Sequence, residues 1–173
     1  MQIIYLDTET TGLRPEHCLI EIAMHTEIDG ILRSWSSKIR TRELLVDPEA
    51  LAYNKIDLRE MINWPYDGEV LGDFYEKMHE WGCVEEGEIV KDLVACGFNV
   101  KFDVTHVNKF VGQFFSHRVL DLTSVALFHG LPAKSNQLIE RYGDPSIEAH
   151  SAYNDALNAY YVHKAMLREL KDA

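Results

Sequence analysis

The stretch that most constrains the fold is IIYLDTETTGL, residues 3–13, in which an apolar run leads directly into two acidic residues. Residues 2–7 have the apolar character of a strand that enters a core. Because successive side chains of a strand alternate between its faces, Asp7 and Glu9 are predicted to lie side by side, with Thr8 on the opposite face. Adjacent carboxylates repel each other, and their burial is costly without a compensating positive charge. The stretch therefore predicts a cation site at the end of a buried strand.

The remaining segments follow an order that is typical of a mixed α/β sheet layered with helices. Asp29-Gly30 is a strong hairpin signal between two strand patterns, and Gly82 predicts the C-terminal cap of the helix before it. The predicted strands are 2–7, 19–28, 31–39, 93–98 and 118–122. The predicted helices are 48–55, 70–81, a segment after residue 98 with Phe110, Phe114 and Phe115 as core anchors, two further segments, and a last helix at about 152–170. We expect a five-stranded α/β sheet, with three antiparallel strands first, then strand–helix units, flanked by helices.

Length and composition narrow the class of protein. A chain of 173 residues predicts a single domain over 1–173. No apolar run is long enough for a membrane span, and the chain enters a strand at once, so neither a membrane association nor a signal peptide is expected. The three cysteines lack CxxC spacing, which predicts reduced thiols in a cytoplasmic protein.

The net charge of −11 is unusual for a protein that grips long nucleic acids, because such proteins neutralise phosphates with basic surfaces. Metal ions bound by the acidic residues would offset part of it. The strongest basic cluster is LRSWSSKIRTR, residues 32–42. It is either a solvated strand face, the favoured reading because strand edges often carry such charges, or a binding stripe.

Two further segments carry polar residues suited to chemistry. Asn99 and Asp103, in GFNVKFD, follow a predicted strand where the chain turns into a helix, and ligands gather at such strand ends in open α/β sheets. His150 and Asp155 lie in HSAYNDA, where Ser151 is a good N-cap candidate. That cap would leave His150 in the preceding loop, free to bend towards the same site, and place Asp155 early in the helix, where the helix dipole favours its charged form.

On these residues the chain resembles the DEDDh family of 3′→5′ exonucleases, the DnaQ-like group with an RNase H-like fold. Asp7 and Glu9 match the first motif of the family, Asp103 the second, and His150 with Asp155 the third, in the family's order. The resemblance spans nearly the whole chain, and three motifs in the correct order are far more specific than any one alone.

The resemblance implies a site for two divalent ions, Mg²⁺ or Mn²⁺, held by Asp7, Glu9, Asp103 and Asp155. Carboxylate oxygens are the hard ligands that such ions prefer. By resemblance, Asp7 would bridge both ions, Glu9 and Asp155 would hold the ion that carries the attacking water, and Asp103 would contribute partly through water. His150 would be the general base, and nucleoside 5′-monophosphates would leave from the 3′ end.

The resemblance also suggests residues that contact the substrate. Thr10, Gly12 and Leu13 would line the pocket of the terminal nucleotide, with Leu13 wedged against the last base, and Asn99 is a candidate substrate contact. Phe98 stands where many relatives have a histidine, so no substrate contact of that histidine is expected here.

The leading hypothesis is a metal-dependent 3′→5′ exonuclease that acts on the 3′ ends of single-stranded DNA. The alternative is an RNA-directed relative, an exoribonuclease or oligoribonuclease, because an acidic chain suits short substrates. Two hypotheses belong to other classes of protein. One is a catalytically silent nucleic-acid-binding or adaptor module, which would be expected to lack one of the five motif residues. The other is a structural Ca²⁺ site. The sequence names no protein partner.

Overall fold

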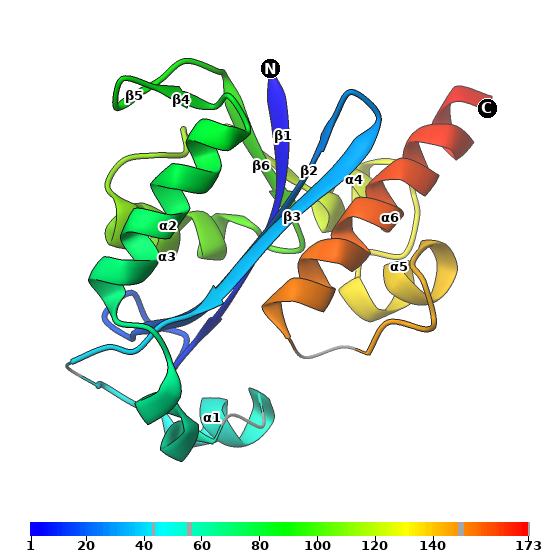
Figure 1. Cartoon of the computed structure of the whole chain (residues 1–173). Helices are drawn as coiled ribbons and strands as arrows, with labels where there is room; N and C mark the ends of the chain where they lie inside the picture. Colours follow the sequence, from blue (N-terminus) through cyan, green and yellow to red (C-terminus); the bar gives the residue numbers. More distant parts are fainter. Residues whose placement is uncertain (43, 55–56, 149–150, 173) are drawn as a thin grey trace.

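A mixed five-stranded sheet forms the centre of the molecule (Figure 1). The structure is a computed structural model that describes residues 1–42, 44–54, 57–148 and 151–172. The strands of the sheet are β1 (Gln2–Thr10), β2 (Leu19–Ile28), β3 (Ile31–Lys38), β6 (Leu93–Gly97) and β7 (Val119–Asp121). Their order is β3-β2-β1-β6-β7; the first three strands pair antiparallel, and β6 and β7 continue the sheet in parallel with β1. This topology confirms the predicted fold class.

Helices cover both faces of the sheet, with α2 and α3 on one side and α4, α5 and α6 on the other (Figure 1). Their bounds are α1 (Pro48–Asn54), the 3₁₀ helix η1 (Leu58–Asn63), α2 (Asp67–Glu80), α3 (Lys101–Val111), α4 (Leu122–Phe128), α5 (Ser135–Tyr142) and α6 (Ala152–Asp172). Among the described helices, none combines the length and apolar character needed to cross a membrane.

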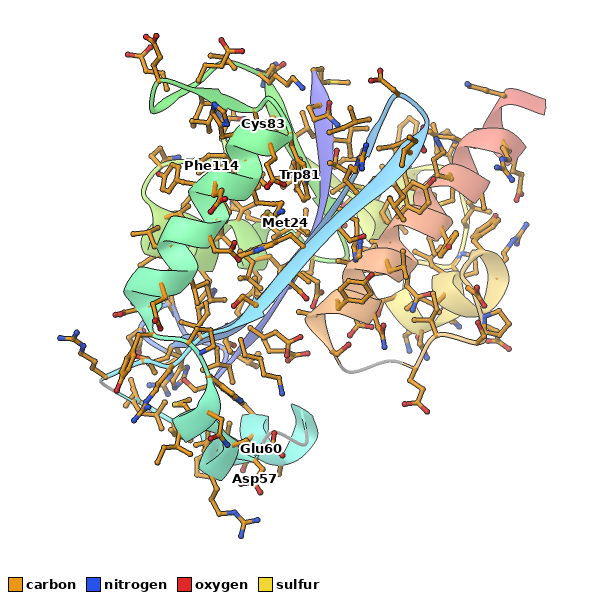
Figure 2. The ribbon with its side chains drawn as sticks, viewed as in Figure 1. Met24, Asp57, Glu60, Trp81, Cys83 and Phe114 are labelled. Carbon is orange, nitrogen blue, oxygen red and sulfur yellow. The ribbon has the colours of Figure 1, made fainter. Side chains whose placement is uncertain are left out.

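The alternation of β1 assigns its side chains to two cores. Ile4 and Leu6 pack into the core under α2 and α3, whereas Tyr5 packs into the core under α6. The first core includes Met24 from β2, Trp81 at the end of α2, and Phe114 after α3 (Figure 2). Because odd-numbered residues of β1 face α6, the carboxylates that follow Tyr5 along the strand are directed to the same side.

The hairpin between β2 and β3 confirms the turn predicted at Asp29-Gly30, since both residues have positive φ, 52° and 76°. β4 (Val84–Glu85) and β5 (Glu88–Ile89) form a second, separate hairpin that the sequence did not predict. Its turn residues, Glu86 and Gly87, also have positive φ, 49° and 83°. The sequence signal was weak there because glutamate, unlike asparagine or aspartate, rarely takes that backbone conformation.

Several element boundaries differ from the predicted ones. β1 extends three residues further than expected, to Thr10, so Glu9 is still in the strand. α2 starts at Asp67 rather than residue 70, because the Glu69 carboxylate accepts a hydrogen bond of 2.7 Å from the Tyr66 N–H. Phe114 and Phe115 are core residues as expected, but they lie beyond the end of α3.

Phe74→Ala is predicted to destabilise the protein by about 3–5 kcal/mol through the cavity it leaves. Phe74 is fully buried, and its ring meets those of Trp35 and Phe114 at centroid distances of 5.8 and 5.0 Å. Urea unfolding in the presence of a chelator measures the change. Phe128→Ala is the matched control, because Phe128 is 85% exposed. Equal effects of the two substitutions would contradict the assigned core.

Candidate active site

Three carboxylates from two elements meet at the end of β1. Asp7 and Glu9 project from β1 towards α6, and Asp155 comes from the first turn of α6. One carboxylate oxygen from each lies within 4.8 Å of the others. The structure thus brings three of the four predicted metal ligands close enough together to share a cation.

The start of α6 explains why Asp155 reaches β1. The Ser151 hydroxyl accepts a hydrogen bond of 3.3 Å from the Asn154 N–H, which is the predicted N-cap. Ala152 and Ala156 then pack on Ala23, the residue of β2 that pairs with Asp7. Three fully buried alanines let the helix lie directly on the sheet beside the carboxylates.

Asp103 reaches the same region from the opposite side of β1. It lies in the first turn of α3, is 4% exposed, and its carboxylate accepts a hydrogen bond of 2.7 Å from the Thr8 hydroxyl. Its charge raises the pKa of Asp7, which shows that the two groups are close. Asp103 is therefore the fourth carboxylate of the site, although it is not one of the three that share the 4.8 Å cluster.

Burial and mutual repulsion perturb these groups strongly. Burial is the main cause that raises the pKa of Asp7 well above its usual range, and the charges of Asp103 and Asp155 add to it. The pKa of Glu9 is raised to about 7, by burial first and then by the charge of Glu21. Burial also raises the pKa of Asp103 to about 7, against the opposite effect of the Thr8 hydrogen bond.

This donor set fits divalent cations. All the ligating atoms are carboxylate oxygens, which Mg²⁺ and Mn²⁺ prefer. The main influences on the pKa values of Asp7 and Glu9 all raise them, and none of these influences comes from a basic side chain. Among the described residues, a bound divalent cation would supply the positive charge that keeps these buried carboxylates ionised.

Two residues that support the site were missed by the sequence reasoning. The sequence predicted Thr8 on the face of the strand opposite Asp7 and Glu9. Its hydrogen bond to Asp103 could not be predicted, because that bond depends on where α3 packs. Glu21 pairs with Glu9 across the β1–β2 register. Burial raises the pKa of Glu21, whereas Lys38 and backbone N–H groups of Tyr153 and Ala152 lower it. Counting back from the Asp29-Gly30 turn places Glu21 opposite Lys38, but its pairing with Glu9 depends on the β1–β2 register, which that turn does not determine.

The loop after β1 holds the residues predicted to contact the terminal nucleotide. Thr10 is buried and its hydroxyl donates to the Gly12 carbonyl at 2.7 Å. A side chain at residue 12 would meet the His17 ring, with Nδ1 2.3 Å from the Cβ position, so the glycine is needed for this internal contact. His17 Nδ1 in turn accepts from the Arg14 N–H at 2.9 Å. Leu13 is 78% exposed at the tip of this loop.

Of the last two predicted site residues, Asn99 and His150, only Asn99 is among the described residues. Asn99 is exposed at the junction of β6 and α3, with a left-handed backbone φ of 54°. His150 lies outside the described residues, so the structure does not place it.

The family is established by comparison. Residues 4–163 match the model of the RNase_T family, described as exonuclease, and the chain belongs to this family. The match confirms the family expected from the sequence and identifies the protein as a nuclease, a phosphodiester hydrolase; two-metal catalysis is typical of the family. No curated protein sequence matches the chain.

Solved structures of nucleases share the fold. Cell-death related nuclease 4 (CRN-4) superposes with a TM-score of 0.72 at 18% identity, over 97% of this chain and 64% of that chain. Exonuclease X, in complex with 5′ overhanging duplex DNA, superposes with a TM-score of 0.60 at 19% identity, over 98% of this chain and 91% of that chain. The nuclease domain of 3′hExo, a DEDDh family member bound to rAMP, superposes with a TM-score of 0.65 at 16% identity, over 99% of this chain and 92% of that chain. The chain spans less than two thirds of CRN-4.

The raised pKa of Glu9 leads to a prediction about stability and pH. Because the folded-state pKa of about 7 exceeds the ordinary 4.5, the folded metal-free protein binds the extra proton between these values. The free energy of unfolding therefore falls as pH rises through this window. Glu9→Gln removes the effect, so this variant should gain on the order of 2 kcal/mol relative to wild type between about pH 4.5 and pH 8.

Urea unfolding in chelator across this range measures the difference, and exposed Glu76 on α2 provides the control Glu76→Gln. Mg²⁺ requires ionised carboxylates, so it should stabilise wild type more at the alkaline end than at the acid end. A constant difference between Glu9→Gln and wild type at all pH values would refute the electrostatic account.

Proposed function

We propose that this chain is a divalent-metal-dependent 3′→5′ exonuclease that hydrolyses single-stranded DNA from its 3′ end and releases nucleoside 5′-monophosphates. The observation that carries the proposal is the cluster of Asp7, Glu9 and Asp155, whose carboxylate oxygens lie within 4.8 Å of one another. The match to an exonuclease family supports the reaction class.

Two ions, Mg²⁺ or Mn²⁺, would be held by Asp7, Glu9, Asp103 and Asp155. When bound, they supply Lewis-acid activation of water and neutralise the charge that develops on the phosphodiester. Rigid elements position every ligand: β1 carries two of them, and α3 and α6 carry one each. The Thr8 hydroxyl holds Asp103 in a fixed orientation through its hydrogen bond.

The remaining roles belong to the proposal as well. His150 directly precedes the N-cap of α6 in the sequence, and we assign it the general base that takes the proton of the attacking water. Exposed Leu13 would pack against the terminal base, with Thr10 and Gly12 shaping the loop that carries it. Asn99, exposed at the start of α3, would contact the same nucleotide.

The proposal also covers the domain organisation of this chain and its location. The family match covers 4–163, which supports one exonuclease domain over 1–173. A cytoplasmic location is part of the proposal, because cysteines without CxxC spacing are typical of chains whose thiols stay reduced.

RNA is the second candidate substrate. Among the structural neighbours, exonuclease X is bound to DNA, whereas 3′hExo is bound to rAMP and another 3′-exonuclease to a histone mRNA stem-loop. Both nucleic acids have been captured on this fold, so the choice of sugar requires a direct comparison.

Digestion of 5′-labelled single-stranded DNA and RNA of equal sequence tests the proposal. Wild type should give a ladder that shortens from the 3′ end with Mg²⁺ or Mn²⁺ and none with chelator. Asp7→Ala should abolish turnover, because it removes a central ligand. His150→Ala should lower turnover by about 10²-fold or more, with metal binding retained.

Asp92→Ala is the control, since Asp92 is an exposed acid paired with Arg118 on the surface. The faster ladder identifies the preferred sugar. A fully active Asp7→Ala protein, or shortening from the 5′ end, would contradict the proposed mechanism.

A further inference from the structure

Two cation–aromatic pairs lie side by side where β3 ends. Lys38 Nζ is 5.0 Å from the centre of the Trp64 ring, and the Arg40 guanidinium carbon is 4.6 Å from that of Tyr66. Residues two apart in extended backbone point to the same side. These four residues, Lys38, Arg40, Trp64 and Tyr66, are called the basic–aromatic track below.

Backbone pairing holds the track in place. The Arg40 N–H donates to the Pro65 carbonyl at 2.8 Å, and Arg40 and Tyr66 form an isolated parallel bridge. Trp64 and Tyr66 both have extended backbone, with ψ values of 151° and 155°. The segment 64–66 therefore runs alongside the residues that follow β3, and its two rings lie against the two basic side chains.

The track begins next to the candidate active site. In the sheet register, Glu9 pairs with Glu21, and Glu21 pairs with Lys38. Directly paired residues of antiparallel strands point to the same face, so Lys38 is on the face that carries the carboxylates. Two strand spacings separate Lys38 from Glu9, about 10 Å between their backbones.

The track is partly open to solvent, since Arg40 and Trp64 are half-buried. The Lys38 side chain is 47% exposed and Tyr66 is 43% exposed. Arg40 is oriented by a hydrogen bond of 3.0 Å from its Nη1 to the Ile62 carbonyl, which leaves the rest of its guanidinium for other contacts. In a chain of net charge −11, such a basic strip beside an acidic site is a distinct feature.

We propose that the basic–aromatic track binds the nucleotides of the substrate that lie immediately 5′ of the terminal one. The inference rests on the proposed exonuclease function and deepens it, because it assigns the path of a single strand. Basic groups that follow a backbone, combined with aromatic rings on which bases stack, are the recurrent means of binding single strands. Continuity with the carboxylate site favours nucleic acid over a protein partner.

One acidic residue opposes this binding. The Glu60 carboxylate lies 3.9 Å from Lys38 Nζ, on η1 beneath the end of β3 (Figure 2). Both side chains are substantially exposed, and ion pairs of this kind are weak. A phosphate would compete with Glu60 for Lys38, so removal of this carboxylate should strengthen binding.

The test measures equilibrium binding of labelled single strands, from a dinucleotide to about 16 nucleotides, by fluorescence anisotropy in DNA and RNA series. All proteins carry Asp7→Ala so that hydrolysis does not consume the probe. The double variant Lys38→Gln/Arg40→Gln should weaken binding of the longest strands about tenfold and reduce the slope of log K against log salt by about 1.4. Binding of the dinucleotide should change little.

Glu60→Gln should strengthen the binding of long strands, by about two- to threefold, because it removes the carboxylate that competes for Lys38. Arg33→Gln is the matched control, because Arg33 is an exposed basic residue of the same strand that pairs with Thr26, far from the carboxylates. A second readout in the Asp7-intact protein is the KM, which the double variant should raise for long strands but not for the dinucleotide.

Unchanged affinity and salt slope in the double variant would overturn the track, as would equal losses for the dinucleotide and the long strands. The two proposals fail separately. Track-dependent binding by a wild-type protein that hydrolyses nothing would refute the exonuclease and retain the track. If wild type hydrolyses its substrate but binding does not depend on Lys38 and Arg40, the track is refuted and the exonuclease is retained.

Discussion

Repulsion between buried carboxylates is the constraint on which the rest of the structure depends. Asp7 and Glu9 are adjacent on the central strand, and Asp155 and Asp103 are brought to them from two helices. In the absence of an ion, burial and like charge raise the pKa values of Asp7 and Glu9. Such an arrangement is unfavourable for folding alone, and a bound cation would offset its cost.

The fold opposes this repulsion with rigid supports on both faces of β1. On one face, buried alanines at positions 23, 152 and 156 seat the start of α6 against the sheet. On the other, Thr8 binds Asp103 through its hydroxyl. The large apolar cores contact the part of β1 that precedes the carboxylates, around Tyr5 and Leu6, so their packing holds the strand while its C-terminal end carries the charges.

The sequence was sufficient where local periodicity determines the answer. Alternation along β1 placed Asp7 and Glu9 together, the Asp29-Gly30 turn defined the β2–β3 hairpin, and Ser151 marked the start of α6. It was insufficient where tertiary contacts decide. The role of Thr8 depends on where α3 packs.

The sequence was also insufficient for residues brought together from different segments. His17 fills the space beside Gly12 only because the loop folds back on itself. The basic cluster of residues 32–42 was read mainly as a solvated strand face. Its alignment with Trp64 and Tyr66 required the backbone bridge between Arg40 and Tyr66, which no local pattern predicts.

The central claim is that the four carboxylates are assembled to hold divalent ions. Crystals grown with Mn²⁺ and measured for anomalous scattering test it most directly, because manganese is located without reference to activity. We expect manganese among the carboxylates of Asp7, Glu9 and Asp155, with a second ion nearby. A well-ordered site without anomalous signal at saturating Mn²⁺, or manganese bound only elsewhere on this acidic surface, would contradict it.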